Sequence, residues 1–341
     1  MKFDVVVGNP PYQEDNAGNN RNSPIYQNFY NLAEKISSIY CLISPARFLF
    51  NAGQTPKDWN EKMLNNEHLK VVYFNQNSSE VFVNTDIKGG IAVLYHDKNE
   101  VFGSIDTFAR FEELQNIMVK VVNSKNFISL NQILYLRSSY KFTDKLLEEN
   151  PNLTGRAKGN EAKSMGSNVF DRYPEIFFDS PHHHEQVQIY GRQNNARIYK
   201  YVNASYIQHG GNLEGWKVFV TKSNGAGALG EVLSTPEIGE PNIGHTQTFI
   251  SIGNFEHKNQ ATALLKYLKC KFTRAMLGIK KITQDNATKE TWSKVPLQDF
   301  SPNSDIDWSK PIAEIDQQLY KKYGLSAAEI EFIETKVKAM D

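Results

Sequence analysis

The sequence predicts an α/β fold for its first hundred residues and an α+β fold for most of the remainder. In the N-terminal part, short apolar runs alternate with segments that carry apolar residues at helical spacing. Strands that alternate with helices typically form a mostly parallel, doubly wound sheet, and we expect one over residues 1–105. Beyond this point, short strands, turns and glycine-rich joints take over. A second domain is therefore expected over residues 106–310, followed by a helical tail over 311–341.

Four strands and two helices are expected in the N-terminal part. The strands are predicted over residues 3–7, 40–43, 70–74 and 91–95, and the helices over residues 24–38 and 59–64. The first strand is a run of mostly β-branched residues, which is typical of a strand buried on both faces. Residues 14–22 are rich in Asn and Gly, so we expect a loop there.

The C-terminal half has one strongly periodic helical segment and a tail of two further helices. Leu264, Leu268, Phe272 and Met276 form an apolar stripe, which predicts a single helix over residues 261–281. The tail predicts two amphipathic helices separated at Gly324. Because Ser is a favoured N-cap residue, we expect Ser326 to begin the second of them.

Composition and charge exclude several classes of protein. No apolar run approaches the roughly 18 residues that span a bilayer, and no signal peptide is evident. The two cysteines lie far apart, and the consecutive histidines 182–184 cannot converge on one ion, so no metal site is expected. We therefore expect a cytoplasmic protein. The net charge is zero overall, but residues 101–300 carry a net +5, which is compatible with a surface that faces phosphates.

The segment Asn9-Pro10-Pro11-Tyr12 follows the first predicted strand directly. An exocyclic amine of a nucleobase is a poor nucleophile because its lone pair is delocalised into the ring. Two acceptors that bind both amine hydrogens free this lone pair, and the Asn9 side chain and the Pro10 carbonyl can serve as the two acceptors. Two prolines fix the backbone that carries this carbonyl. Tyr12 offers a flat face on which a base flipped out of the duplex can stack.

Residues 3–12 resemble motif IV of the adenine-N6 DNA methyltransferases of restriction–modification systems. Later segments are similar to later motifs of this family in the same order: residues 24–30 to motif V, 43–49 to motif VI, and 81–95 to motifs VII and VIII. The resemblance implies that Tyr95, near the end of the last predicted strand, stacks on the second face of the flipped base. It also implies that residues 1–105 form an incomplete Rossmann-like methyltransferase sheet.

Several segments of the C-terminal half look like the target-recognition domain of type II enzymes with fused specificity domains. These are residues 215–218, 246–249, 292–300 and 315–333. The resemblance implies double-stranded DNA as a partner. We expect Lys217, Lys222, Lys280 and Lys281 to contact phosphates, and Gln284 to contact adenine edges.

The cofactor implied by the resemblance is S-adenosylmethionine, whose binding motif precedes motif IV in enzymes of this order. Only eight residues precede Asn9, so we expect this site largely outside the chain, on a second chain or missing from a truncated product. The one G-x-G-x-x-G run comprises Gly225, Gly227 and Gly230, and Pro236 leaves little room for the helix that would receive a cofactor. We interpret this run as a DNA-facing or structural loop.

The expected function is methyl transfer from S-adenosylmethionine to the exocyclic amine of adenine in a specific DNA sequence. Asn at position 9 favours adenine, although related loops act on the amine of cytosine as well. The alternative is a DNA-specificity module or gene remnant without chemistry of its own. The neighbouring upstream reading frame discriminates between the two, because a split enzyme requires the glycine-rich cofactor motif there.

Overall fold

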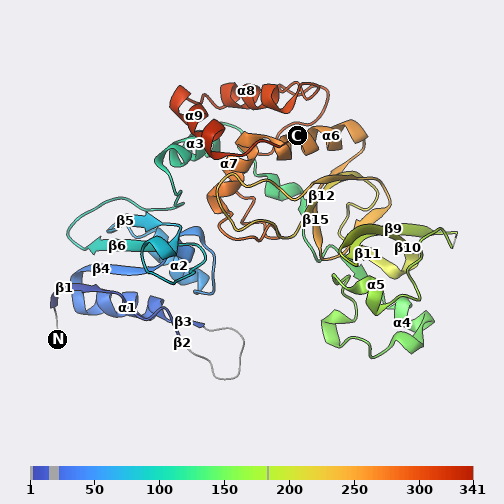
Figure 1. Cartoon of the computed structure of the whole chain (residues 1–341), viewed down its shortest axis with the longest axis horizontal. Helices are drawn as coiled ribbons and strands as arrows, with labels where there is room; N and C mark the ends of the chain where they lie inside the picture. The colour runs from blue at the N-terminus through green and yellow to red at the C-terminus, as the bar shows by residue number, and fades with distance from the viewer. Residues whose placement is uncertain (1–2, 15–22, 183, 341) are drawn as a thin grey trace. The chain divides into compact units, whose positions relative to one another are not determined.

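The computed structural model describes residues 3–14, 23–182 and 184–340 (Figure 1). The chain divides into two compact units, Met1–Gln115 and Asn116–Asp341. Helix α3 (Glu112–Val122) carries the chain from the first unit into the second. Most of the loop predicted over residues 14–22 lies outside the described residues. No helix among the described residues is both long enough and apolar enough to cross a membrane.

Unit 1 is built on a four-stranded sheet in the order β1-β4-β6-β5. The strands are β1 (Phe3–Gly8), β4 (Ser37–Pro45), β5 (Leu69–Asn75) and β6 (Ile91–Asp97). β1 pairs in parallel with β4, whereas β6 runs antiparallel to both β4 and β5. All four predicted strands are therefore present, but the prediction of a mostly parallel sheet is wrong.

The reason lies in the connection between β5 and β6. A parallel return requires a crossover of roughly a dozen or more residues, usually with a helix that packs on the sheet. The connection here, residues 76–90, is long enough for a crossover but contains only the short 3-10 helix η2 (Ser78–Glu80), with no α-helix to pack across the sheet, and it ends in the turn Gly89–Gly90. The chain therefore re-enters the sheet from the same end, and β6 runs antiparallel between β4 and β5.

One face of the sheet is covered by α1 (Tyr26–Ile36), the 3-10 helix η1 (Ala46–Phe50) and α2 (Lys57–Leu64). The buried ring of Tyr30 lies 5.9 Å from that of Tyr40 and 5.8 Å from that of Trp59. Its hydroxyl is 2.9 Å from the Ser44 hydroxyl, which satisfies both buried groups. Aromatic packing between α1, α2 and β4 thus fixes the helical layer against the sheet.

The edge strand β1 is not the buried strand that its sequence predicts. Phe3, Val5 and Val7 are 49%, 48% and 75% exposed. Their burial would require neighbours on both faces and along the outer edge, and among the described residues β1 pairs only with β4. An exposed, apolar edge without a bulge or a Lys is a surface on which another polypeptide readily pairs.

Unit 2 contains small sheets with antiparallel pairing at most of their contacts. One has the order β13-β12-β15-β7, a second β10-β9-β14, and a third pairs β11 with β8. Their strands are β7 (Leu134–Tyr135), β8 (Tyr140–Phe142), β9 (Gln186–Gln193), β10 (Ala196–Asn203), β11 (Ile207–His209), β12 (Trp216–Thr221), β13 (Glu237–Gly239), β14 (Ile243–His245) and β15 (Phe249–Phe255). Short helices α4 (Lys145–Glu149) and α5 (Val169–Arg172) lie beside them.

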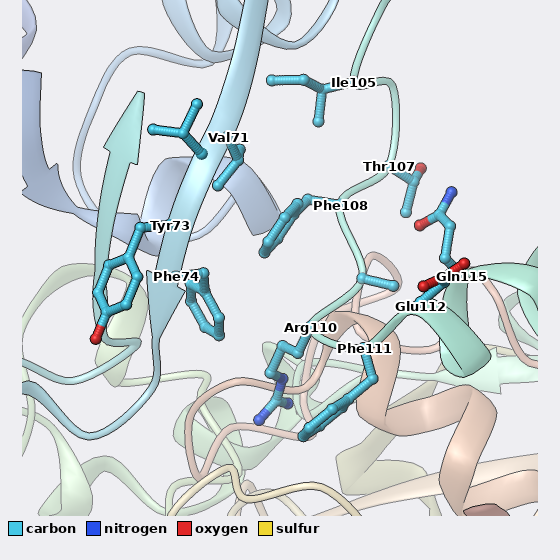
Figure 2. Close-up of a pocket in the computed structure, with 12 residues that line it drawn as sticks. Val71, Tyr73, Phe74, Ile105, Thr107, Phe108, Arg110, Phe111, Glu112 and Gln115 are labelled. Atoms are coloured by element: carbon cyan, nitrogen blue, oxygen red, sulfur yellow. The ribbon is translucent and has the colours of Figure 1, made fainter. Parts of the chain in front are cut away.

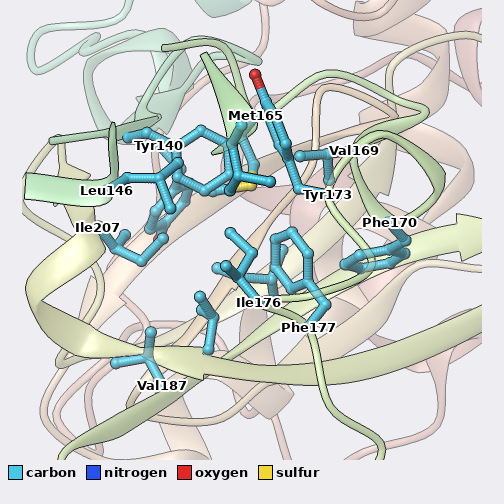
Figure 3. Packing of buried hydrophobic residues seen from close by; sticks show 14 of the residues in the cluster. Tyr140, Leu146, Met165, Val169, Phe170, Tyr173, Ile176, Phe177, Val187 and Ile207 are labelled. Atoms are coloured by element: carbon cyan, nitrogen blue, oxygen red, sulfur yellow. The ribbon is translucent and has the colours of Figure 1, made fainter. Parts of the chain in front are cut away.

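A buried apolar cluster joins these short elements (Figure 3). Tyr140 and Phe142 on β8 contribute to it, and the Phe142 ring lies 5.6 Å from that of Tyr173. Phe170 and Phe177 pack edge to face at 4.9 Å. Aromatic and aliphatic side chains from these short strands and helices thus share one buried cluster, which holds them together.

The helix predicted over residues 261–281 is two helices, α6 (Lys258–Lys269) and α7 (Lys271–Lys280). Between them Cys270 adopts an extended conformation. The carboxylate of Asp316, on α8 (Ile312–Lys322), accepts hydrogen bonds from the backbone N–H of Lys271 and Phe272, each at 2.9 Å. A carboxylate from elsewhere in the chain therefore caps α7 and makes the break favourable, although the local periodicity continues through it.

The tail forms two helices as predicted, α8 and α9 (Ala327–Lys336). Gly324 between them adopts a φ of +61°, which glycine tolerates without steric cost. Ser326 caps α9 and forms a capping box with Glu329, each side chain bonding the other residue's backbone N–H. The predicted break and N-cap are both confirmed.

We expect acid to destabilise unit 2 through His245. This side chain is fully buried, and burial lowers its pKa from 6.5 to about 4, against the opposing effect of the Thr246 carbonyl. Between these pH values the unfolded chain binds the proton and the folded chain does not, so the unfolding free energy falls as the pH drops from 6.5 to 4, by about 3 kcal/mol. Denaturant titrations across this range measure the loss.

The variant His245→Gln should show a flatter pH dependence because it lacks the titrating group. The control is His184→Gln, which removes an exposed histidine. Equal slopes for the two variants would refute the assignment to His245.

Candidate active site

The loop Asn9–Tyr12 leaves the carboxyl end of β1 and is held at both of its ends. Gly8 pairs with Leu42 on β4, and Pro10 is buried while Asn9 is exposed. On the far side, the Tyr12 carbonyl accepts a hydrogen bond of 3.1 Å from the backbone N–H of Ile25, just before α1. The short pair β2 (Gln13–Glu14) and β3 (Ser23–Pro24) continues this contact. The loop is therefore fixed between the sheet and α1.

This loop forms a wall shared by two hollows. The larger, of about 500 Å³, is bordered by Pro11 and Tyr12. The smaller, of about 200 Å³, is bordered by Asn9 and Pro10 together with apolar side chains of β1, β4 and α1. Asn9 and Tyr12 thus border different hollows although only two residues separate them.

The phenol of Tyr12 is buried without a hydrogen-bond partner among the described residues. Burial raises the pKa of Tyr12, and the nearby Asn9 side chain acts in the opposite direction. Asn9 is therefore close enough to influence the phenol, although the two do not meet in the geometry of a full hydrogen bond. The ring, and not the hydroxyl, is the part of Tyr12 that is available for chemistry at this wall.

The larger hollow is completed by a turn that only glycine can make. Its wall includes Ile87, and the turn that follows brings Gly90 against the end of β5, where a Cβ atom would collide with the Asn75 carbonyl. Gly90 also has a φ of +80°, and its carbonyl accepts a 2.9 Å hydrogen bond from the Ala46 N–H. Nearby, Arg47 donates from Nε to the Lys88 carbonyl.

Arg47 and Tyr26 are among the residues of the larger hollow that were not predicted as site residues. Burial raises the pKa of Tyr26 to about 12, whereas Thr55 and Arg47 act to lower it. Both residues lie within the segments that resemble motifs V and VI. Their proximity to Tyr12 depends on the return of the chain through α1 and β4, which local sequence does not encode.

Tyr95 does not reach this hollow. Tyr95 pairs with Cys41 on β4, and Cys41 pairs with Val7 on β1. Tyr95 therefore lies level with Val7, before the strand β1 ends. Since β6 runs antiparallel to β4, its carboxyl end points away from the Asn9–Tyr12 loop. Tyr95 instead donates to Asp97 at 3.3 Å and packs beside Phe102 at 6.0 Å. The position of Tyr95 therefore gives no support to its stacking role, which the family resemblance implied.

Lys217 is not a surface residue, and its predicted contact with phosphate is wrong. It is fully buried, and its ammonium donates to the Leu213 and Ile243 carbonyls at 2.9 and 3.0 Å. Burial lowers the pKa of Lys217 to about 7, with Glu214 acting in the opposite direction. The position is on β12, where the sequence pattern does not reveal that both faces are covered.

Lys280 and Lys281 are also buried and have partners within unit 2. Lys280 pairs with Glu290 at 3.1 Å, and Lys281 pairs with Glu231 at 3.2 Å. Their predicted phosphate contacts are therefore not supported. Lys222 is half-buried, with its ammonium 3.4 Å from the Ser167 hydroxyl, and Gln284 is exposed. These two residues keep side-chain positions from which DNA contacts are feasible.

The Gly225–Gly230 loop binds a carboxylate of its own chain. The backbone N–H groups of Ala226 and Gly227 donate to the Glu231 carboxylate at 2.7 and 3.1 Å. Burial acts to raise the pKa of Glu231, but the backbone N–H groups of Ala226 and Ala228 together with Lys281 outweigh it, and the pKa is lowered. The concavity that such a loop offers to a phosphate is filled, which supports the structural interpretation of the loop.

Another hollow, of about 470 Å³, lies at the outer edge of β5 and contains none of the predicted site residues (Figure 2). The Phe74 and Phe108 rings pack at 5.3 Å, and the Arg110 guanidinium lies 5.8 Å from the centre of the Phe50 ring. Among the described residues, no group of three or more His, Cys, Asp or Glu side chains is placed to bind a metal ion. His183 lies outside them.

Part of unit 1 matches a known protein family. Residues 1–82 match the model of the Eco57I restriction-modification methylase family. The match confirms the resemblance to restriction–modification methylases. A Mycoplasma pneumoniae protein named an uncharacterized adenine-specific methylase is 33% identical over 103 residues, which cover 29% of this chain. The matched region spans 24% of the length of that relative.

Two solved structures are similar to most of the chain at very low sequence identity. The type IIG restriction endonuclease BpuSI matches 92% of this chain and 49% of its own, with 8% identity and a TM-score of 0.31. The type IIL restriction-modification enzyme MmeI, solved in complex with DNA, matches 98% of this chain and 56% of its own, with 10% identity and a TM-score of 0.40. The chain thus spans about half of each.

Replacement of Glu231 by Ala should destabilise unit 2 by roughly 3 kcal/mol, because it removes the carboxylate that pairs with the buried Lys281 ammonium and accepts hydrogen bonds from two backbone N–H groups. Equilibrium unfolding in urea measures this loss. The control is Glu314→Ala, whose partner Lys310 lies 3.9 Å away on an exposed surface. A loss no larger than that of the control would contradict the role of Glu231 in this loop.

Proposed function

We propose that this chain supplies the base-binding half of an active site that transfers a methyl group from S-adenosylmethionine to the exocyclic amine of adenine in DNA. The observation that carries the proposal is the Asn9–Tyr12 loop, fixed between β1 and α1 and bordered by a hollow on each side. The family match over residues 1–82 and the name of the Mycoplasma relative support methylation and adenine, respectively.

The chemistry assigned to the loop follows from its two acceptors. The Asn9 side-chain oxygen and the Pro10 carbonyl are each proposed to accept one hydrogen of the target amine, which moves its nitrogen toward tetrahedral geometry and frees the lone pair. Pro10 is buried and is followed by a second proline, so its carbonyl is held in one orientation. Because acceptors of fixed orientation need no reorganisation during the reaction, they stabilise the charge that develops on the amine.

The target base is proposed to lie in the larger hollow, with its ring against Tyr12 and its amine directed toward Asn9 and Pro10 at the wall shared with the smaller hollow. A hollow of about 500 Å³ falls within the usual range for small-molecule sites and accommodates one flipped base. Tyr26 and Arg47 belong to the same wall, so stacking and a cationic group are both available there. This combination of aromatic and cationic side chains suits a planar, polar ligand.

The described residues do not fit the whole cofactor. The smaller hollow beside Asn9 is lined almost entirely by apolar side chains, including Phe29 and Leu32, and contains no carboxylate for a ribose or an ammonium group. The cofactor supplies the methyl group when bound. We propose that most of its site is contributed by a second chain that pairs with the exposed edge of β1, where Val5 and Val7 are uncovered.

The variant Asn9→Ala should abolish methylation by the reconstituted complex and leave DNA binding nearly unchanged, because it removes one acceptor of the amine. Transfer of a tritiated methyl group measures activity, and fluorescence anisotropy measures binding. Nucleoside analysis of the product distinguishes N6-methyladenine from N4-methylcytosine. Retained methylation by this variant would disprove the mechanism.

Tyr12 offers a matched pair of variants. Tyr12→Phe keeps the ring and removes a hydroxyl that has no partner among the described residues, so activity should be nearly unchanged. Tyr12→Ala removes the stacking surface and should lower kcat/KM by roughly ten- to a hundredfold, in keeping with about 1–3 kcal/mol per stacked base. Equal losses in both variants would show that stacking is not the role of the ring.

Because most of the cofactor site is proposed to lie on a second chain that pairs with the β1 edge, the isolated chain should bind S-adenosylmethionine weakly or undetectably. Isothermal titration calorimetry of the chain alone, and then of the chain with the product of its upstream reading frame, measures the difference. Val7→Lys should prevent formation of the complex, because it places a charge on the apolar edge. Micromolar binding by the isolated chain would overturn this part of the proposal.

The second candidate function is a DNA-specificity module without chemistry of its own. It is compatible with the Gly225–Gly230 loop, whose amides bind Glu231 and are therefore not offered to a cofactor. It predicts DNA binding without methylation in the presence of every candidate partner. The activity of the reconstituted complex therefore discriminates between the two functions.

A further inference from the structure

Unit 2 contains a polar hollow of about 720 Å³ that none of the predicted DNA contacts lines. Its walls come from β8, from the segment before α5, from α5 itself and from the turn that follows β14. The lining residues are Ser138, Lys141, Gly159, Asn160, Glu161, Lys163, Ser164, Gly166, Ser167, Asn168, Arg172 and Gln247. Three cations, one carboxylate and otherwise hydroxyls, amides and glycines border it, so it is unsuited to an apolar ligand.

The backbone brings Lys141, Ser164 and Gln247 to one side of this hollow. Lys141 and Ser164 form an antiparallel bridge, and residues opposite each other in such a bridge direct their side chains to the same face. Gln247 donates from its side-chain amide to the Ser164 hydroxyl at 2.7 Å. Its backbone N–H donates to the Met165 carbonyl at 2.8 Å, so both its main chain and its side chain are oriented.

The cations of the hollow differ in how firmly they are held. Lys163 pairs with Asp144 at 2.6 Å, but both side chains are exposed, and such pairs contribute little and are easily exchanged. The Arg172 guanidinium is fixed by the Glu161 carbonyl and the Asn168 side chain, each at 2.9 Å. The exposed Lys141 forms no ion pair among the described residues.

One of the predicted DNA contacts lies at the rim of the same hollow. The Lys222 ammonium is 3.4 Å from the hydroxyl of Ser167, which is a lining residue. Lys222 therefore extends the cationic surface of Lys141, Lys163 and Arg172. A concave surface with several cations and hydroxyls binds successive phosphates, and the fixed amide of Gln247 lies among them.

We propose that this hollow, which we call the Lys141 cleft, is a DNA-recognition surface of unit 2, in which Lys141 and Lys163 contact phosphates and Gln247 contacts a base edge. Hydrogen bonds to phosphates position a protein on the duplex, whereas amide side chains discriminate bases. Gln247 uses one amide N–H for Ser164. Its second N–H and its oxygen remain for N7 and the N6 amine of an adenine, the bidentate contact typical of Gln.

This inference rests on the proposed function for its partner, but its test does not depend on methylation. The probe is a fluorescein-labelled DNA duplex of random sequence, titrated with the full chain at several salt concentrations. The variant Lys141→Gln/Lys163→Gln should weaken binding about tenfold at low salt. Because each lost phosphate contact releases about one counterion fewer, the slope of log K against log salt should fall by roughly two.

The matched control is Lys145→Gln/Lys321→Gln, which removes the same charge at exposed positions that do not line the Lys141 cleft. All four lysines are exposed, so neither double variant should alter the thermal unfolding of the chain. Equal binding and equal salt slopes for the two double variants would overturn the proposal. A loss common to both would show that only overall charge matters, which also contradicts it.

Gln247→Ala tests the contact with the base. Selection of bound duplexes from the random pool, followed by sequencing, measures base preference at each position. The variant should lose preference for adenine at one position while its affinity for the unselected pool stays unchanged, and Gln132→Ala, an exposed control, should retain it. Unchanged preference would refute the role of Gln247.

The two proposals can fail separately. If the Lys141→Gln/Lys163→Gln variant binds DNA normally while Asn9→Ala abolishes methylation, the Lys141 cleft alone is refuted. If that variant loses DNA binding while Asn9→Ala retains methylation, the methylation proposal alone is refuted.

Discussion

The parallel pairing of β1 with β4 is the constraint on which the candidate active site depends. This pairing sets Gly8 opposite Leu42, so that the Asn9–Tyr12 loop emerges beside the end of β4, where Arg47 follows. The Ser37 hydroxyl donates to the Asp4 carbonyl at 3.1 Å and strengthens the start of the same pair. A shift of register by one residue would turn every side chain of β1 to the other face and remove Asn9 from the small hollow.

The same pairing leaves β1 with a free edge, and the two features have one physical origin. A strand that presents its carboxyl-end loop as a wall between two hollows must lie where ligands can approach from both sides. β1 meets this requirement at the edge of the described sheet, at the cost of exposing Val5 and Val7. The exposed edge and the Asn9–Tyr12 loop are therefore neighbouring parts of unit 1, at the surface proposed for a second chain.

Unit 2 uses many of its charges internally. Glu231 occupies the glycine-rich loop, Lys217 bonds two carbonyls, and Asp316 caps α7 from α8. Buried charges must have such partners, because an unpaired charge inside a protein is costly. Lysine-rich sequence in this unit is consequently a poor guide to DNA contacts, whereas Lys141 and Lys163 are exposed and line one concave surface.

Local sequence patterns predicted the strands of unit 1 and the helices of the tail, and they suggested the chemistry proposed for the Asn9–Tyr12 loop. Continuous apolar runs, the Gly324 break and the Ser326 cap are local signals, and the corresponding strands and helices are present. The tertiary structure decided what depends on distant neighbours: the antiparallel direction of β6, the exposure of β1, the interruption at Cys270 and the burial of Lys217. Strand direction, edge position and burial depend on pairing partners far away in the sequence, and no local pattern encodes them. For the same reason the surroundings of Tyr95, the place of Arg47 and Tyr26 beside Tyr12, and the Lys141 cleft were not predicted.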